Sequence, residues 1–174
     1  VVDLGGGSFL QILFPDRDTS KLSPNDGSIV MKLVYGKTSV MLQGDSTSKI
    51  EEYLVTLDKG ELKSDILKTG HHGSRTSTSQ VYVEAVEPGW AIISAGEDNS
   101  YGHPHQEVVD NLNKHKVKII GTYDIGRIVF ESDGETSAMP IMPPLLIYEK
   151  YPTRKRVNDS CPLRTQRVSK SAAR

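Results

Sequence analysis

The sequence predicts a layered α/β sandwich with mixed sheets, and three observations lead to it. Short apolar runs alternate with segments whose apolar residues have helical spacing, a two-residue turn joins two early runs, and polar clusters follow several runs. The chain has 174 residues, 36% of them hydrophobic, which is enough to bury the core of one domain. Its apolar runs all fall short of the roughly 20 residues that a membrane helix needs.

The first elements are predicted to be strands, two of which form a hairpin. An apolar run over 9–14 stops at a proline, and a loop rich in Asp, Ser, Pro and Gly follows over 16–27. The runs at 28–35 and 38–43 are separated only by Gly36-Lys37. So short a connection predicts that these two strands pair with each other.

Strands and helices alternate in the rest of the chain. Further strands are predicted at 65–69, 90–94, 117–120 and 127–130. One helix is predicted to start directly after Asp45, a second to span 80–86 behind a Ser79 cap, and a third to have Pro104 at its first position. Beyond Gly134 the periodicity is lost.

Charge divides the chain unevenly. The net charge is −1, yet residues 150–174 contain eight Lys or Arg and one acidic residue, so the preceding part is acidic. We therefore expect a domain over 1–135 and a basic tail over 136–174. The composition of the tail favours a disordered extension, and contact with DNA or an anionic surface is the alternative.

Three polar clusters lie where predicted strands end, and they are the candidates for chemistry because side chains there project into loops. They are Gly44-Asp45, His71-His72-Gly73-Ser74 and Tyr101-Gly102-His103-Pro104-His105. Each allows a structural and a functional interpretation. Asp45 is either a helix N-cap or a carboxylate that binds a metal and can bridge two.

The histidines also allow two interpretations. Imidazole is the commonest nitrogen ligand of zinc, so one of His71 and His72 can bind a metal while the other contacts substrate or stabilises negative charge. The alternative is an exposed polar loop. His103 and His105 either cap the following helix or line the rim of a site. Ser74 and Arg75, with Thr76 and Ser77 after them, are candidates for binding phosphate oxygens.

Together these segments resemble the hydrolase domain of the ComEC-type DNA-uptake proteins, a branch of the metallo-β-lactamase-fold hydrolases. The resemblance covers residues 1–135. The motifs that carry it are Asn25-Asp26-Gly27-Ser28-Ile29-Val30 with Gly36, Val40-Met41-Leu42-Gln43-Gly44-Asp45, Leu67-Lys68-Thr69-Gly70-His71-His72-Gly73-Ser74, Ala91-Ile92-Ile93-Ser94 and Gly102-His103-Pro104-His105.

The resemblance implies the C-terminal part of a metallo-β-lactamase-like αββα sandwich with one or two divalent ions, zinc or manganese. It implies that Asp45 is a metal ligand, that His71 and His72 supply a ligand and a catalytic substrate contact in an order left open, and that His103 and His105 lie near the substrate. Such a metal lowers the pKa of water towards about 7, so that hydroxide attacks phosphorus. The implied substrate is DNA or another phosphodiester, with a small ester as the alternative.

One departure from the family pattern limits this expectation. The superfamily's main metal motif, His-x-His-x-Asp-His, is missing, since the first histidine here is His71. We therefore expect the chain to start inside the domain, and two or three ligands do not complete a zinc site. The alternative to a hydrolase is a catalytically silent fragment or binding module. The resemblance also implies a parent attached to a membrane with this soluble domain outside the cytoplasm, or else a secreted or cytoplasmic protein.

Overall fold

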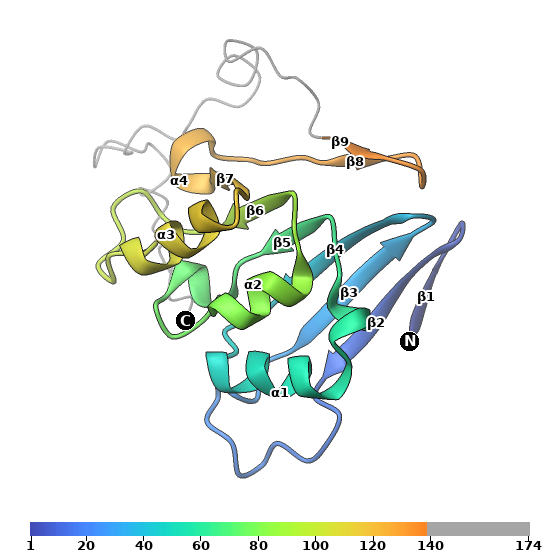
Figure 1. Ribbon diagram of the computed structural model, residues 1–174, viewed down its shortest axis with the longest axis horizontal. Helices are drawn as coiled ribbons and strands as arrows, with labels where there is room; N and C mark the ends of the chain where they lie inside the picture. Colours follow the sequence, from blue (N-terminus) through green and yellow to red (C-terminus); the bar gives the residue numbers. More distant parts are fainter. Residues whose placement is uncertain (139–174) are drawn as a thin grey trace, which may run out of the picture. The chain divides into compact units, whose positions relative to one another are not determined.

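The computed structural model describes residues 1–138, and every structural statement below refers to them. They form a mixed α/β fold built on one seven-stranded sheet, in which the strands follow each other in chain order (Figure 1). No helix within this range is long and apolar enough to cross a membrane. Most of the predicted basic tail, from residue 139 on, lies outside the described residues.

The sheet has an antiparallel and a parallel half. Strands β1 to β4 pair antiparallel, and β4 to β7 pair parallel. The seven strands are β1 (Val2–Gly5), β2 (Ser8–Phe14), β3 (Val30–Tyr35), β4 (Thr38–Gln43), β5 (Ile66–Lys68), β6 (Trp90–Ile93) and β7 (Lys118–Gly121). The helices are α1 (Ser48–Asp58), α2 (Gln80–Val86), α3 (Gln106–Lys114) and α4 (Thr122–Ile125), with the short 3-10 segments η1 (Lys59–Leu62) and η2 (Gly70–Gly73). A separate pair of strands, β8 (Glu131–Ser132) and β9 (Ser137–Ala138), forms a second small sheet.

The predicted order of strands and helices is confirmed through β7. The β3–β4 hairpin turns at Gly36, and its Cβ position would lie 2.1 Å from the Gly134 oxygen, so a larger residue would not fit. Two helix starts were predicted too early. Helix α1 begins at Ser48 rather than directly after Asp45, and α3 begins at Gln106, which leaves Pro104 outside the helix.

The predicted strand at 127–130 is wrong, because this segment pairs with no strand. Its apolar character serves packing instead: the ring of Phe130 meets that of Trp90 edge-on at 5.8 Å. The chain then reaches the β3–β4 turn, where the Ser132 and Thr38 hydroxyls lie 2.6 Å apart. Strands β1, β8 and β9 were not predicted.

One face of the large sheet is covered by α1, α2 and α3 (Figure 1). Under α1 and α2, the core contains Phe14, Val30, Met41, Ile50, Leu54, Leu62, Leu67, Tyr82, Ala85 and Val86. Under α3, it contains Val83, Ala91, Ile93, Val108, Leu112 and Val117. In β6 the two core residues Ala91 and Ile93 alternate with Ile92, as expected when one face of a strand is buried.

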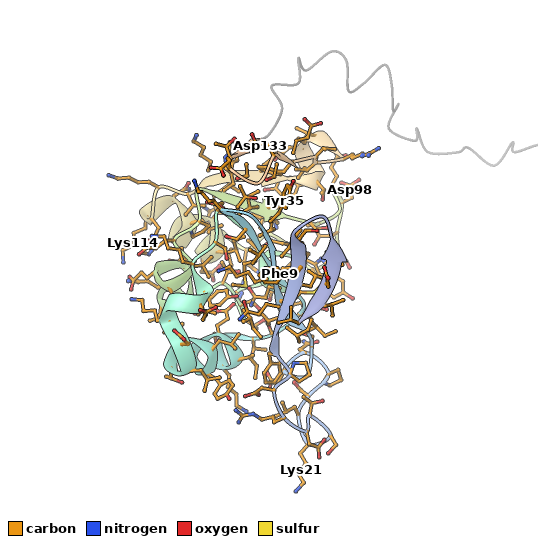
Figure 2. All side chains as sticks on the ribbon, turned by 90° about the vertical axis from the view of Figure 1, so that its right-hand side faces the viewer. Phe9, Lys21, Tyr35, Asp98, Lys114 and Asp133 are labelled. Carbon is orange, nitrogen blue, oxygen red and sulfur yellow. The ribbon has the colours of Figure 1, made fainter. Side chains whose placement is uncertain are left out.

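The opposite face, which we call the open face, is largely apolar and only partly covered within residues 1–138. In β6, Ala91 and Ile93 are fully buried on the helix face, whereas Ile92 between them is half-buried. In the strand register Ile92 lies between Ile120 and Lys68 on this face, and beyond Lys68 the apolar residues Leu42, Met31, Leu33, Ile12 and Leu10 follow on the other strands. No helix of the described chain packs on this face, and Figure 2 gives the side view with Lys114 of α3 on the helix side.

The Tyr82 hydroxyl offers a test of the core. Tyr82 is fully buried, its hydroxyl has no hydrogen-bond partner within residues 1–138, and burial, with the nearby charge of Glu51, raises its pKa well above the ordinary value. We expect Tyr82→Phe to leave the free energy of unfolding unchanged or to raise it by up to about 2 kcal/mol, because a desolvated hydroxyl is removed. Tyr82→Ala should lower it by about 3–5 kcal/mol through the cavity it leaves. Urea unfolding of both variants measures this, and a clear loss in Tyr82→Phe would contradict it.

Candidate functional site

The polar clusters meet at the edge of the sheet where β4, β5 and β6 end. Leu42, Lys68 and Ile92 are in register across these parallel strands, so the strands end level with one another. Beyond them follow Gly44-Asp45, the η2 turn and Ser94. Two clusters far apart in sequence are thereby brought to one place, as expected for the carboxyl edge of parallel strands.

The η2 turn has an unusual backbone. His71 and His72 both have positive φ angles, 46° and 58°, in the left-handed region that side chains rarely adopt. The His71 N–H donates to the Gly44 oxygen at 3.0 Å, and the Ser74 N–H donates to the His71 oxygen at 2.9 Å. A Cβ at Gly73 would lie 2.8 Å from the Cβ of Pro104. The turn is therefore held by β4 on one side and by the third cluster on the other.

The His72 ring faces Asp45. Its Nδ1 lies 2.7 Å from the Ser94 carbonyl oxygen, and since a carbonyl only accepts, Nδ1 carries the proton. The other nitrogen, Nε2, lies 3.6 Å from Oδ1 of Asp45. Both side chains are about half exposed, at 50% and 44%. The Ser94 carbonyl thus fixes the ring so that Nε2 and the carboxylate point at the same small space.

The N-cap interpretation of Asp45 is wrong. The cap residue of α1 is Thr47, whose side chain makes no capping hydrogen bond, and the helix starts three residues after Asp45. The Thr47 hydroxyl donates instead to Asp26 in the preceding loop. The Asp45 carboxylate is therefore available to the site.

His71 and His103 lie beside this pair. Nδ1 of His71 is 3.2 Å from the Thr76 hydroxyl, and the His71 ring is 6.4 Å from that of His72 and 5.8 Å from that of His103. The Asn99 side chain holds His103 by accepting from its N–H at 2.8 Å and donating to its oxygen at 2.7 Å. Burial comes first among the causes that lower the pKa of His103, followed by His105, His71 and His72.

Both predicted roles of His105 have a structural counterpart. It is the N-cap residue of α3, although its side chain makes no capping hydrogen bond. Its ring lies 4.9 Å from that of His103, and its Nδ1 accepts the Arg75 N–H at 3.2 Å. Its own N–H donates to the Gly73 oxygen at 2.9 Å. His105 therefore joins the start of α3 to the η2 turn.

The two other predicted substrate contacts differ in exposure. Ser74 is 5% exposed, and its hydroxyl lies 3.1 Å from that of Thr76 inside the loop. Arg75 is exposed, with one guanidinium nitrogen 3.5 Å from a carboxylate oxygen of Glu107. Arg75 can thus meet a ligand from solvent, whereas Ser74 faces the loop.

Sequence reasoning missed Ser94, Asn99 and Lys68. Lys68 donates to the Gln43 oxygen at 2.9 Å and to the Thr69 oxygen at 3.3 Å, and burial lowers its pKa while the charge of Asp45 opposes that shift. Its place in the Leu-Lys-Thr-Gly motif was the available signal. Ser94 acts through its backbone, which no side-chain pattern reveals.

The donor types at this edge suit a divalent metal, but their number does not complete a site. Carboxylate oxygen and imidazole nitrogen are the ligands that zinc accepts, usually four together. Within residues 1–138 no group of three or more His, Cys, Asp or Glu side chains is arranged to hold a metal ion. The described residues therefore offer suitable donor types without a complete set of ligands.

The His103 ring gives a pH test. Because its pKa is lowered, the folded chain favours the neutral ring, so the stability of the fold is undiminished above pH about 6.5 and decreases as pH falls from there through the lower pKa of the folded ring. We expect an NMR titration of His103 to have its midpoint below 6.5. His105→Asn should move the midpoint upward by removing a neighbouring positive charge, and Asn suits the N-cap position. A wild-type midpoint at or above 6.5 would contradict the assignment.

Three curated proteins are similar to this chain. The "ComE operon protein 3" of Bacillus subtilis is 34% identical over 122 residues, which are 70% of this chain and 16% of that protein. The "Competence protein ComA" of Neisseria gonorrhoeae is 36% identical over 113 residues, 65% of this chain and 16% of that protein. The "Recombination protein 2" of Haemophilus influenzae is 37% identical over 123 residues, 70% of this chain and 15% of that protein.

No protein-family profile matches the chain. The chain spans about one sixth of the length of the curated relatives that it matches. Their shared level of identity nevertheless confirms the resemblance found in the motifs. Over about 70% of its length, the chain is a homologue of one segment of the ComEC-type competence proteins.

Proposed function

We propose that this chain supplies part of a divalent-metal site that hydrolyses phosphodiester bonds in DNA, within a protein that takes part in DNA uptake. The observation that carries the proposal is the facing pair of His72 Nε2 and Asp45 Oδ1, 3.6 Å apart, at the carboxyl edge of the sheet. Two electron-pair donors held this way are stabilised by a cation or a proton between them. The similarity to proteins named for competence supports the biological role.

In this proposal His72 is the metal ligand and His71 is the catalytic substrate contact. The hydrogen bond from His72 Nδ1 to the Ser94 oxygen is the support that metal-bound histidines usually have. Within residues 1–138 the His71 ring has no such carbonyl partner, and it lies towards Thr76 and His103. His103 and His105 border the same space, and Arg75 binds a phosphate oxygen on the solvent side.

The metal is zinc or manganese, as one or two ions, and it would supply a water of lowered pKa and neutralise charge on the phosphate. Asp45 and His72 would hold it on this side. The remaining ligands are proposed to come from residues outside 1–138, because the described part has too few. This follows the absence of a His-x-His-x-Asp-His run from the sequence.

The open face supports the finer proposal for the fold, a metallo-β-lactamase-like αββα sandwich. A sheet with apolar residues on both faces requires a covering layer on each. Helices cover one face, and Ile92 and Leu33 remain half-buried on the other. We propose that a second sheet packs on the open face and brings the missing ligands to the same edge.

Metal binding and cleavage test the proposed chemistry. We expect the protein that contains both halves of the site to bind Zn²⁺ or Mn²⁺ and to cleave single-stranded DNA, and Asp45→Asn to reduce cleavage by at least about 100-fold, since a metal ligand is lost. Asp110→Asn is the matched control, because Asp110 lies exposed on α3, where its carboxylate only accepts from Gln106. Equal cleavage by Asp45→Asn and the wild type would refute the proposal.

A second candidate is a non-catalytic binding module, which the incomplete ligand set of the described residues favours. It predicts that even the protein containing both halves of the site, the longer protein, binds no metal at Asp45 and does not cleave DNA. Calorimetric titration of Zn²⁺ into the longer protein and into its Asp45→Asn variant distinguishes the two candidates. Only the hydrolase predicts a difference between them.

Two neighbouring isoleucines test the proposed second sheet. Ile93 is fully buried under the helices, whereas Ile92 points to the open face. In the isolated chain we expect Ile93→Thr to cost about 2 kcal/mol or more and Ile92→Thr less than about 1 kcal/mol. When the second sheet is present, the cost of Ile92→Thr should rise towards that of Ile93→Thr. Chemical unfolding of both variants in both forms measures this, and an unchanged small cost of Ile92→Thr would contradict the sandwich.

A further inference from the structure

Glu51 is the only charged side chain that is fully buried within residues 1–138, with 0% of its surface exposed. It lies in the first turn of α1, six residues after Asp45. A buried carboxylate costs several kcal/mol unless hydrogen bonds or charges compensate it, so its contacts show what it does in the fold.

Three N–H donors surround this carboxylate. Oε1 accepts from the Gln43 side-chain amide at 2.5 Å and from the Thr78 backbone N–H at 2.5 Å. Oε2 accepts from the Ser79 backbone N–H at 2.8 Å. One carboxylate therefore joins the end of β4 to the loop that leads from the η2 turn into α2.

The two joined segments carry the residues of the proposed metal site. Asp45 lies between Gln43 and Ser46, and Gln43 also donates to the Ser46 hydroxyl at 3.1 Å. On the loop side, the Ser77 hydroxyl donates to the Ser46 oxygen at 2.6 Å. The Thr76 oxygen accepts the Ser48 N–H at 2.8 Å. Glu51 is thus at the centre of the contacts that set the distance from Asp45 to the turn with His71 and His72.

The backbone of the loop depends on the same carboxylate. Thr78 has a φ angle of 59°, which a β-branched residue adopts only when its surroundings compensate the strain. The hydrogen bond from the Thr78 N–H to Glu51 is such a compensation, and Asn111 supports the other side by donating to the Thr78 oxygen at 2.7 Å. Gly70, at the start of the turn, packs closely on Gln43. The Cβ of any other residue at this position would lie 2.6 Å from the Gln43 amide carbon.

We propose that Glu51 is a positioning residue that holds Asp45 and His72 at the separation required for metal binding. The inference rests on the proposed function, since it assigns Glu51 to that site. Glu51 touches neither metal nor substrate and acts only through the Gln43–Ser46 segment and the 74–79 loop.

The test compares Glu51→Gln with Leu54→Ala. Glutamine has nearly the same shape, but its NH₂ group would face one of the N–H donors, so at least one hydrogen bond is lost. Leu54 lies one turn further along α1, is 3% exposed and packs only in the apolar core. Leu54→Ala therefore lowers stability without disturbing the joined segments.

The measurement is Zn²⁺ affinity, by competition with a chromophoric chelator, in the protein that contains both halves of the site. We expect Glu51→Gln to weaken Zn²⁺ binding by about 10–100-fold, the range found when a residue supporting a metal ligand is lost. Leu54→Ala should change it by less than about twofold. Wild-type affinity in folded Glu51→Gln, or equal weakening in both variants, would overturn the proposal.

A second readout separates this inference from the proposed function. In metal-free protein, the His72 Nδ1 proton that is bonded to the Ser94 oxygen should give a slowly exchanging NMR signal. We expect Glu51→Gln to broaden or remove this signal and Leu54→Ala to keep it. If the wild type binds no Zn²⁺, the proposed function fails, and this signal alone decides whether Glu51 positions the His72 ring: its persistence in Glu51→Gln overturns the inference.

Discussion

The parallel pairing of β4, β5 and β6 is the constraint on which the rest of the structure depends. Parallel strands run in the same direction, so their carboxyl ends, and the loops that follow, gather at one edge. Asp45, His72 and Ser94 are 49 residues apart from first to last, yet each lies within four residues of one of these three ends. Without this register the His72 ring would have neither its carbonyl partner nor the facing carboxylate.

Several parts of the fold support the strained backbone of the η2 turn at that edge. Two successive left-handed residues cost about 1–2 kcal/mol each relative to ordinary backbone. Three contacts hold this turn and its loop in place. They are the hydrogen bond to the Gly44 oxygen, the close approach of Pro104 to Gly73, and the hydrogen bond to the buried carboxylate of Glu51. Such strain persists where surrounding contacts over-determine it, and it gathers at functional sites.

Periodicity and turn-forming residues were enough to predict most of the strands and helices. Strands β2 to β7 and helix α2 were found because their apolar residues recur with the correct period between Gly, Pro and Asn. The segment 127–130 has the same apolar character but uses it for packing on Trp90, a choice that only the tertiary structure makes. Strand β1 was missed because it is exposed throughout and ends in glycines.

For the candidate site, the sequence indicated which side chains to consider but not what supports them. Asp45, His71 and His72 were chosen from the motifs, because carboxylate and imidazole groups are common metal ligands. Their supports did not: Ser94 uses a backbone carbonyl, and Glu51 looks like any exposed acid in an amphipathic helix until α1 is docked on the sheet. Burial of a charged residue is a property of the assembled layers, so a single sequence does not encode it locally.

The short first strand has a consequence for how copies of this chain meet one another. A free sheet edge invites pairing with a neighbouring molecule, but β1 is only four residues long, and its pairing with β2 shifts register between Asp3 and Gly5. Such an irregular edge is a poor template for adding strands. Copies of this chain should therefore not join into longer sheets through β1.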